Sequence, residues 1–205
     1  MKNLKFAAAG IALCASMLLT ACGSTQTVEY KHSKVDANGK FTCELLGIGA
    51  DFDTSVWTFV DDSTIAAANG ASSVSDADLK AVLDKSGALQ EMMAMQESGT
   101  NVLMVYENTD VTKLGNVSED DYIGKSVDLF EQQLKQQLDN VSSKKVSVTI
   151  AGQSHPALDA QGDVEGETLY SRYICIRKGQ YVAIISINAL EESEINEITK
   201  MFYSL

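Results

Sequence analysis

The sequence predicts an α+β fold in which a mainly antiparallel sheet is sandwiched by helices. Strand-like segments that alternate with short glycine-containing turns indicate hairpins, and the strands of a hairpin pair antiparallel. Two segments with apolar residues at three- and four-residue spacing indicate helices that cover the sheet. The last pair of strands is apolar on both faces, which is typical of a sheet covered on two sides.

Length and composition indicate one domain, and the chain is strongly acidic. The 205 residues are 45% apolar, which is sufficient for a hydrophobic core. The formal charge is −12, and a chain that begins at Cys22 loses Lys2 and Lys5, the only charged residues before it, for a net charge of −14. A surface of this sign repels phosphate backbones, so we expect no nucleic-acid partner.

The first 22 residues have the layout of an export signal, with a positively charged start, an apolar run over 6–19 and a small-residue end. The residues at that end, which resemble the bacterial lipobox, are Leu19, Thr20, Ala21 and Cys22. In that motif the cysteine sulfur receives a diacylglyceryl group, and a signal peptidase that recognises the three preceding residues cuts before it. We therefore expect a helical lipoprotein signal peptide over 1–21 and a protein that lipid on Cys22 holds at the extracytoplasmic face of the cell membrane.

Two alternatives place the protein differently. Cleavage after Gly23, with Ala21 and Gly23 as the small residues of an ordinary signal-peptidase site, would release a soluble secreted protein. The apolar run could also remain as a membrane anchor. Residues 6–21 are only 16 residues long, however, whereas a spanning helix needs about 20.

Residues 22–40 are polar and small, without a sustained apolar period. They predict a flexible tether between the lipidated cysteine and a single α+β domain over 41–205. His32 lies in this segment and is expected to be solvated.

The domain is expected to begin with two strands and two short helices. Residues 41–46 and 56–60 are rich in side chains that favour strands. A helix over 62–69 is expected to stop at Gly70, because glycine readily takes the left-handed conformation found at helix ends. Ser75 is the expected N-cap of the second helix.

The segment 89–106 is ambiguous between a helix and a hairpin. Its first part, 90–97, has helix-forming composition. Ser98-Gly99-Thr100 is a turn signal, however, and 101–106 reads plainly as a strand. We therefore prefer a hairpin.

The clearest helix is predicted over 119–139. Ser118 is its expected N-cap, and three acidic residues follow in its first turn, at the positive end of the helix dipole. The apolar residues that recur along one face are Ile123, Val127, Phe130, Leu134 and Leu138.

The remaining elements are strands and a closing helix. Glycine accepts a positive φ, so Lys178-Gly179 suits a tight reversal between two apolar strands. The predicted strands span 146–150, 153–157, 168–177 and 181–188, and the closing helix spans 191–203.

In element order and in the patterns Val56–Phe59 ("VWTF") and Ile150–Leu158 ("IAGQSHPAL"), the chain resembles small bacterial cell-surface lipoproteins of the PsbP-like fold group. The resemblance covers most of 41–205 and includes no catalytic signature. It implies an α/β/α sandwich and a non-enzymatic binding or assembly role, and it transfers no ligand residues.

The cysteines leave one question open. Cys14 departs with the signal peptide and Cys22 receives the lipid, so Cys43 and Cys175 remain in the domain. Outside the cytoplasm these two can form a disulfide, or they can stay as two buried free thiols. The sequence favours neither alternative.

The sequence contains no motif for catalysis, for a metal or for a cofactor. His155 precedes Pro156 and is expected to be structural, and the acidic segment 159–167 is expected to be a solvated turn. We therefore expect no catalytic residue, no metal site and no cofactor. The alternative is an envelope hydrolase that uses surface carboxylates.

A ligand or partner surface is one interpretation of Trp57 with the nearby Asp51 and Asp53, and core packing is the other interpretation of the tryptophan. Taken together, the sequence predicts a non-catalytic, lipid-anchored extracytoplasmic binding or accessory protein. Its expected partners are the membrane, through the lipid, and an envelope protein.

Overall fold

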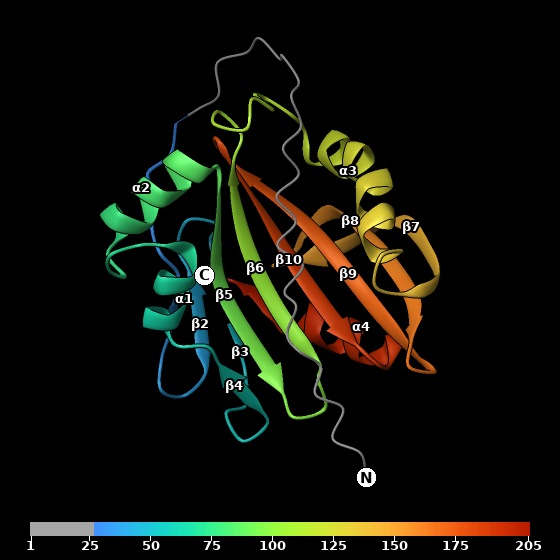
Figure 1. The fold of residues 1–205 in the computed structure, drawn as a ribbon. Coiled ribbons are helices and arrows are strands. Elements are labelled where there is room, and N and C mark those ends of the chain that lie inside the picture. The colour runs from blue at the N-terminus through green and yellow to red at the C-terminus, as the bar shows by residue number, and fades with distance from the viewer. Residues whose placement is uncertain (1–26) are drawn as a thin grey trace.

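The computed structural model describes residues 27–205 (Figure 1), so the predicted signal peptide and the lipobox lie outside the described residues. The strands are β1 (Lys34–Val35), β2 (Lys40–Cys43), β3 (Ile48–Asp51), β4 (Trp57–Phe59), β5 (Ala88–Gln96), β6 (Asn101–Asn108), β7 (Asp139–Ile150), β8 (Gln153–Val164), β9 (Glu167–Lys178), β10 (Tyr181–Ala189) and β11 (Phe202–Ser204). The helices are α1 (Asp62–Asn69), α2 (Asp76–Ser86), α3 (Glu119–Leu134) and α4 (Glu192–Lys200). None of these four helices is long and apolar enough to cross a membrane.

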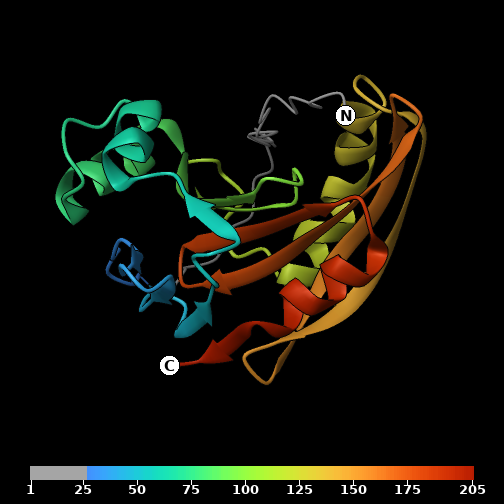
Figure 2. The same ribbon diagram turned by 90° about the horizontal axis from the view of Figure 1, so that it is seen from below.

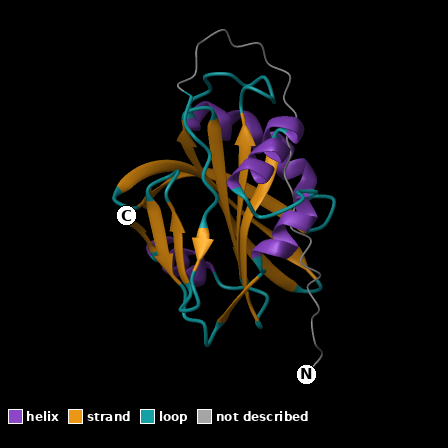
Figure 3. Ribbon diagram, turned by 90° about the vertical axis from the view of Figure 1, so that its left-hand side faces the viewer, coloured by secondary structure: helices purple, strands orange, loops and turns teal. Residues whose placement is uncertain are grey.

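The strands form two sheets, drawn in orange in Figure 3. The larger sheet has the order β4-β5-β6-β10-β9-β8-β7, and the smaller one has the order β1-β2-β3-β11. Every pairing in both sheets is antiparallel. The predicted α+β class with a mainly antiparallel sheet is confirmed.

Helices and the smaller sheet cover the two faces of the larger sheet (Figures 1 and 2). On one face, α3 packs over β7, β8 and β9, with the rings of Phe130 and Tyr173 4.8 Å apart. On the other face, α1, α2, α4 and the smaller sheet enclose the larger core cluster, which includes Phe41, Leu83 and Ile185. Two cores thus lie on opposite faces of one sheet.

Local signals place the first two helices and the β5–β6 hairpin as predicted. The side chain of Ser75 accepts a hydrogen bond from the backbone N–H of Asp78 at the start of α2. Gly70, with φ of 75°, ends α1 in the left-handed conformation. The ambiguous segment 89–106 forms the hairpin of β5 and β6.

The predicted helix over 119–139 is too long, because α3 ends at Leu134 and β7 begins at Asp139. β7 and β8 pair along most of their length, with Lys144 opposite Asp159. Residues 135–138 form the turn between α3 and β7, and Leu138 packs against the core cluster under α3 from that turn, so its place in the apolar period does not require a longer helix. The prediction of a solvated turn over 159–167 is also wrong, since β8 continues to Val164.

The closing helix predicted over 191–203 ends at Lys200, and the next residues form β11 beside β3. Phe202 is 5% exposed and reaches the larger core from this strand. The N–H of Leu205 donates to the carbonyl of Gly47 at 3.0 Å. Long-range pairing with β3 therefore replaces the last helical turn.

The predicted flexible tether over 22–40 is wrong for residues 27–40, which pack against the domain. Tyr30 is 2% exposed, and its ring centroid lies 6.0 Å from that of Tyr106 and 6.2 Å from that of Tyr181. The backbone N–H of Val28 donates to the Gln180 side chain at 2.8 Å, and the Gln180 amide donates back to the Val28 carbonyl at 2.9 Å. The ordered domain therefore includes residue 28, because a buried tyrosine and satisfied backbone groups hold this segment in place.

Candidate functional site

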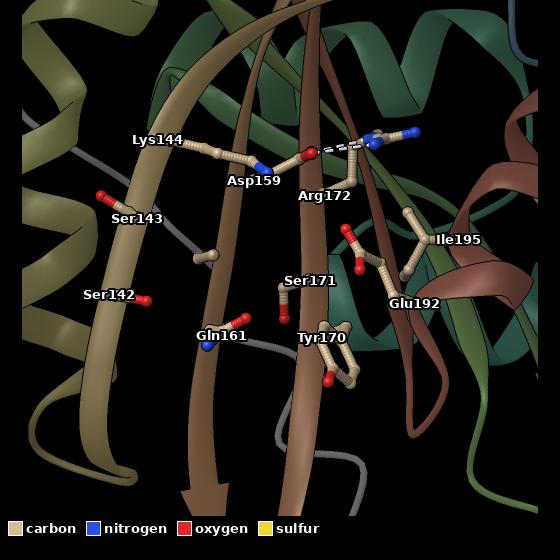
Figure 4. A pocket seen from close by; sticks show the side chains of 11 residues that line it. Ser142, Ser143, Lys144, Asp159, Gln161, Tyr170, Ser171, Arg172, Glu192 and Ile195 are labelled. Carbon is tan, nitrogen blue, oxygen red and sulfur yellow. Dashed lines mark hydrogen bonds and ion pairs between the residues drawn. The ribbon is translucent and has the colours of Figure 1, made fainter.

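A polar pocket lies beside α4, where β7, β8 and β9 pass the first turns of that helix (Figure 4). Its volume is about 110 Å³. The polar side chains that line it include Lys144, Asp159, Gln161, Tyr170, Arg172 and Glu192. The pocket thus joins residues from four elements that are separated along the chain.

An ion pair forms the floor of this pocket. Arg172 donates from Nε to Oδ1 of Asp159 at 2.6 Å and from Nη2 to Oδ2 at 2.8 Å, as the dashed lines in Figure 4 show. Its Nη1 donates to Asn196 at 3.1 Å and to Thr199 at 3.2 Å, both on α4. The side chains of Arg172 and Asp159 are only 10% and 17% exposed. This bidentate contact is rigid, and it leaves the Asp159 carboxylate engaged.

The rim of the pocket has a different character. Four of its polar side chains form no hydrogen bond or ion pair with the described part of the chain, namely Lys144, Gln161, Tyr170 and Glu192. They present an ammonium, an amide, a phenol hydroxyl and a carboxylate. These donors and acceptors are available to a polar group from outside the domain.

This site was not predicted from the sequence, although the sequence contains a signal for it. In the β8–β9 hairpin, Asp159 faces Arg172 and Gln161 faces Tyr170. Glu165 and Gly166 both have positive φ, of 50° and 89°, and form the turn between the strands. A tight turn at Glu165-Gly166 pairs residues at equal distances on either side, so recognising that turn would have brought these side chains together.

The structure separates the roles of the three residues considered as a partner surface. Trp57 is 6% exposed and packs edge-on against Phe52, with ring centroids 5.2 Å apart, so it is a core residue. Asp51 is exposed and accepts a hydrogen bond from the hydroxyl of Tyr203 at 3.0 Å. Asp53 is exposed and accepts from the hydroxyl of Ser55 at 2.6 Å.

Cys43 and Cys175 are free and buried in the structure. Cys43 belongs to the larger core cluster, where its sulfur lies 3.0 Å from the hydroxyl of Tyr106, and Cys175 belongs to the cluster under α3. The structure therefore matches the alternative in which the two cysteines are buried free thiols. Burial raises the pKa of the Cys43 thiol to about 11 and raises the pKa of Cys175 well above its usual value.

His155 has the structural role that the sequence predicts. Its Nδ1 lies 2.9 Å from a carboxylate oxygen of Glu119, the first residue of α3. The other carboxylate oxygen of Glu119 accepts a hydrogen bond from the backbone N–H of Arg177 at 2.7 Å. The contact ties the start of α3 to β8 and β9.

His32 is not solvated, which corrects the prediction made for it. Glu91, 1% exposed on β5, accepts hydrogen bonds from the Tyr30 hydroxyl at 2.7 Å and from the backbone N–H of Ser33, and it lies 3.0 Å from Nδ1 of His32. We refer to these four residues as the Glu91 clamp. Burial alone lowers the pKa of His32, but the hydrogen bond and negative charge of Glu91, together with Asp62, raise it above the usual value.

Within residues 27–205, no three His, Cys, Asp or Glu side chains are grouped so that they could hold a metal ion. Leu19, Thr20, Ala21 and Cys22 lie outside the described residues.

No family model matches the chain, and no curated protein matches it. Similar solved structures include PA94 of Pseudomonas aeruginosa, a protein of unknown function (19% identity, TM-score 0.31, 47% of this chain and 63% of that one), so the chain spans less than two thirds of PA94. They also include LpqN of Mycobacterium tuberculosis, which is involved in cell envelope biogenesis (12% identity, TM-score 0.40, 76% of this chain and 82% of that one). A third is the solution structure of cyanobacterial PsbP, CyanoP, from Synechocystis sp. PCC 6803 (13% identity, TM-score 0.43, 91% of this chain and 99% of that one). The α+β class is thus shown by the structure itself, and at these identities and TM-scores the similarities assign neither a family nor a function to the chain.

Proposed function

We propose that this chain is a lipid-anchored accessory protein of the extracytoplasmic face of the cell membrane, and that it binds an envelope protein through the polar pocket beside α4. The location is supported by the sequence Leu19-Thr20-Ala21-Cys22 at the end of an export signal. Two or three acyl chains on Cys22 would hold the protein firmly, since each buried methylene contributes about 0.8 kcal/mol.

The observation that carries the binding role is the contrast between the floor and the rim of the pocket. Arg172 and Asp159 satisfy each other, so the floor has a fixed shape before any partner arrives. The rim groups of Lys144, Gln161 and Glu192 have no partner in the described chain and can bond to a visiting polar group. A preformed floor lowers the entropy cost of binding.

The size of the pocket favours a protein partner. Pockets for drug-sized molecules enclose about 300–1,000 Å³, whereas this pocket encloses about 110 Å³. That space suits the end of one polar side chain that projects from a larger surface. We propose that such a side chain enters between Lys144 and Glu192, with Tyr170 as an aromatic contact at the rim.

A non-catalytic role is supported by the state of the groups that an enzyme would use. His32 and His155 each bond to a carboxylate that holds the fold together. Asp159, the most central carboxylate of the pocket, is bound at both oxygens by Arg172. A carboxylate engaged in this way is less available to contact a substrate.

Site-specific photo-crosslinking in intact envelopes tests the proposal. A photoreactive residue in place of Gln161 is expected to give one discrete protein adduct, and the same residue in place of the exposed Gln136, in the connection between α3 and β7, is expected to give none. Adding Lys144→Glu should abolish the adduct at 161, since it reverses one rim charge. Identical adducts at both positions, or an adduct insensitive to Lys144→Glu, would contradict the pocket as the contact site.

A further inference from the structure

We infer that the domain stands end-on at the membrane, with the end that carries the β9–β10 turn and the connection between β6 and α3 against lipid headgroups. The inference rests on the proposed lipid on Cys22. It adds a second interaction surface, which we call the proximal end and define by Val111, Lys113, Arg177 and Lys178.

The length of the chain between the lipid and the domain fixes which end is near the membrane. Val28 is bound to Gln180 by two hydrogen bonds, of 2.8 and 2.9 Å. From Cys22 to Val28 there are six residue steps (28 − 22 = 6). Six steps of extended chain span at most about 20 Å, whatever their conformation. The backbone of Val28, to which the Gln180 side chain is bound, therefore lies within about 20 Å of the Cys22 backbone.

The groups around Gln180 are those of the proximal end. The backbone N–H of Thr109 donates to the Gln180 carbonyl at 2.8 Å, which joins the β6–α3 connection to the β9–β10 turn. Arg177 reaches from β9 to the same connection, because its Nη1 donates to Asn116 and to the carbonyl of Val117, each at 2.6 Å. In Figure 1 these segments lie together at the upper end of the molecule, where the described chain also begins.

The packing of residues 28–33 against the sheet limits how far the domain can move from the lipid. Had residues 22–40 been a flexible tether, any face of the domain could have turned toward the bilayer. The Glu91 clamp and the buried ring of Tyr30 hold residues 28–33 on the sheet, so only residues 23–27 are left between the lipid and the first fixed contact.

The proximal end is close to neutral, although the protein as a whole is acidic. Lys113, Arg177 and Lys178 form no ion pair with the described part of the chain, and the nearby acids are Asp110, Glu29 and Glu119, whose carboxylate accepts a hydrogen bond from the backbone N–H of Arg177. Three positive charges thus meet three negative ones (3 − 3 = 0), so this end lacks the repulsion from anionic headgroups that the net charge of −14 from Cys22 onward gives the rest of the protein. Val111 is 36% exposed and adds an apolar contact.

This orientation also places the polar pocket away from the bilayer. Arg172 and Lys178 lie on the same strand, six residues apart, which corresponds to about 20 Å along β9. A partner can therefore reach the pocket without displacing lipid.

Fluorescence quenching with the lipidated full-length mature protein tests the orientation. A fluorophore is attached to Lys113→Cys in one sample and to Ser98→Cys, in the turn between β5 and β6 at the opposite end of the sheet, in a matched control. Cys43 and Cys175 are buried, so they should not compete for the label. In phosphatidylcholine vesicles that contain a nitroxide-headgroup lipid, quenching at 113 should exceed quenching at 98 several-fold.

The charge contribution is tested in the same vesicles. In vesicles that also contain phosphatidylglycerol, Lys178→Glu makes the proximal end acidic and should lower the ratio of domains in contact with the bilayer to detached domains about fivefold, whereas Lys144→Glu in the pocket should leave this ratio unchanged. Equal quenching at 113 and 98 in protein that is lipidated and bound would overturn the orientation alone. Protein that carries no lipid and does not bind the vesicles would overturn both the orientation and the proposed anchor.

Discussion

The Nδ1 atom of His32 lies 3.0 Å from a carboxylate oxygen of Glu91, although 59 positions separate the two residues in the chain. The side chain of Glu91 is fully buried in β5, and that of His32 is 7% exposed. The contact fixes the segment that leads toward Cys22 on the surface of the sheet. In the proposed lipid-anchored protein, the packing of this segment limits how far the domain can move from the membrane.

Removing the charge of Glu91 should loosen this segment. In the wild type, the groups of the clamp share the two carboxylate oxygens of Glu91. Glu91→Gln leaves them one acceptor oxygen, and the loss of a buried charged partner typically lowers the free energy of unfolding by about 3 kcal/mol. Urea unfolding should show this decrease, and amide hydrogens of residues 28–35 should exchange faster. Glu97→Gln, at an exposed position after the same strand, should change the free energy of unfolding by less than about 0.5 kcal/mol. Equal effects of the two substitutions would contradict the clamp.

The Glu91 clamp should also weaken as pH rises through the folded-state pKa of His32. The folded-state pKa of His32 is raised above its ordinary value of 6.5, because Glu91 and the nearby charges of Asp62 and Asp76 favour the imidazolium and outweigh its burial. A raised folded pKa adds stability that is complete below 6.5 and is lost as pH rises through the folded pKa. The stability difference between the wild type and His32→Gln should thus shrink with rising pH. If the difference in the free energy of unfolding stays constant as pH rises from 6.5, the charge of His32 does not contribute to stability.

The ion pair in the floor of the pocket should behave as a coupled unit. A double-mutant cycle with Arg172→Gln and Asp159→Asn is expected to give a coupling free energy of about 2 kcal/mol, since both partners are charged and largely buried. Arg172→Gln should be the more damaging single change, because Asn196 and Thr199 on α4 lose their donor as well. The measurement is urea unfolding of the four proteins, and additive effects would refute the coupling.

The two domain thiols should be reduced and unreactive in the native protein. Burial raises the pKa of Cys43 to about 11, so little reactive thiolate forms at neutral pH. Alkylation without reductant should label neither Cys43 nor Cys175 in the folded protein and both after unfolding, as mass spectrometry would show. Thiols that become reactive after unfolding only when reductant is added would indicate a disulfide instead.

The elements that the sequence predicted well are those whose signals are local. Ser75 and Gly70 mark helix ends by capping alone, and Gly179 marks its hairpin without information from elsewhere, although the turn occupies Gly179-Gln180 rather than the predicted Lys178-Gly179. The hairpin over 89–106 was preferred for the same reason, because the turn signal lies between its strands.

The elements that the sequence predicted poorly depend on distant partners. β7 begins at Asp139, well before the strand predicted over 146–150, because β8 pairs with it, and β11 forms because β3 offers an open edge. The polar segment before residue 41 lacks an apolar period, yet one buried tyrosine and one buried glutamate from β5 are enough to order it. No local pattern in residues 27–40 reports the position of Glu91.

The candidate site was missed for a related reason. The acidic residues of 159–167 were interpreted as a solvated turn, but the turn occupies only Glu165 and Gly166, and Asp159 lies in β8 opposite Arg172. The register of a hairpin decides which charges meet, and an error of a few residues in the turn hides the pair.

The most direct measurement of the central claim is the intact mass of the native protein extracted from cell membranes. The account predicts a chain that begins at Cys22, with a diacylglyceryl group on its sulfur, and with a further acyl chain where the new amino terminus is modified. An unmodified sulfur at Cys22, or a terminus at Ser24 after cleavage beyond Gly23, would contradict it.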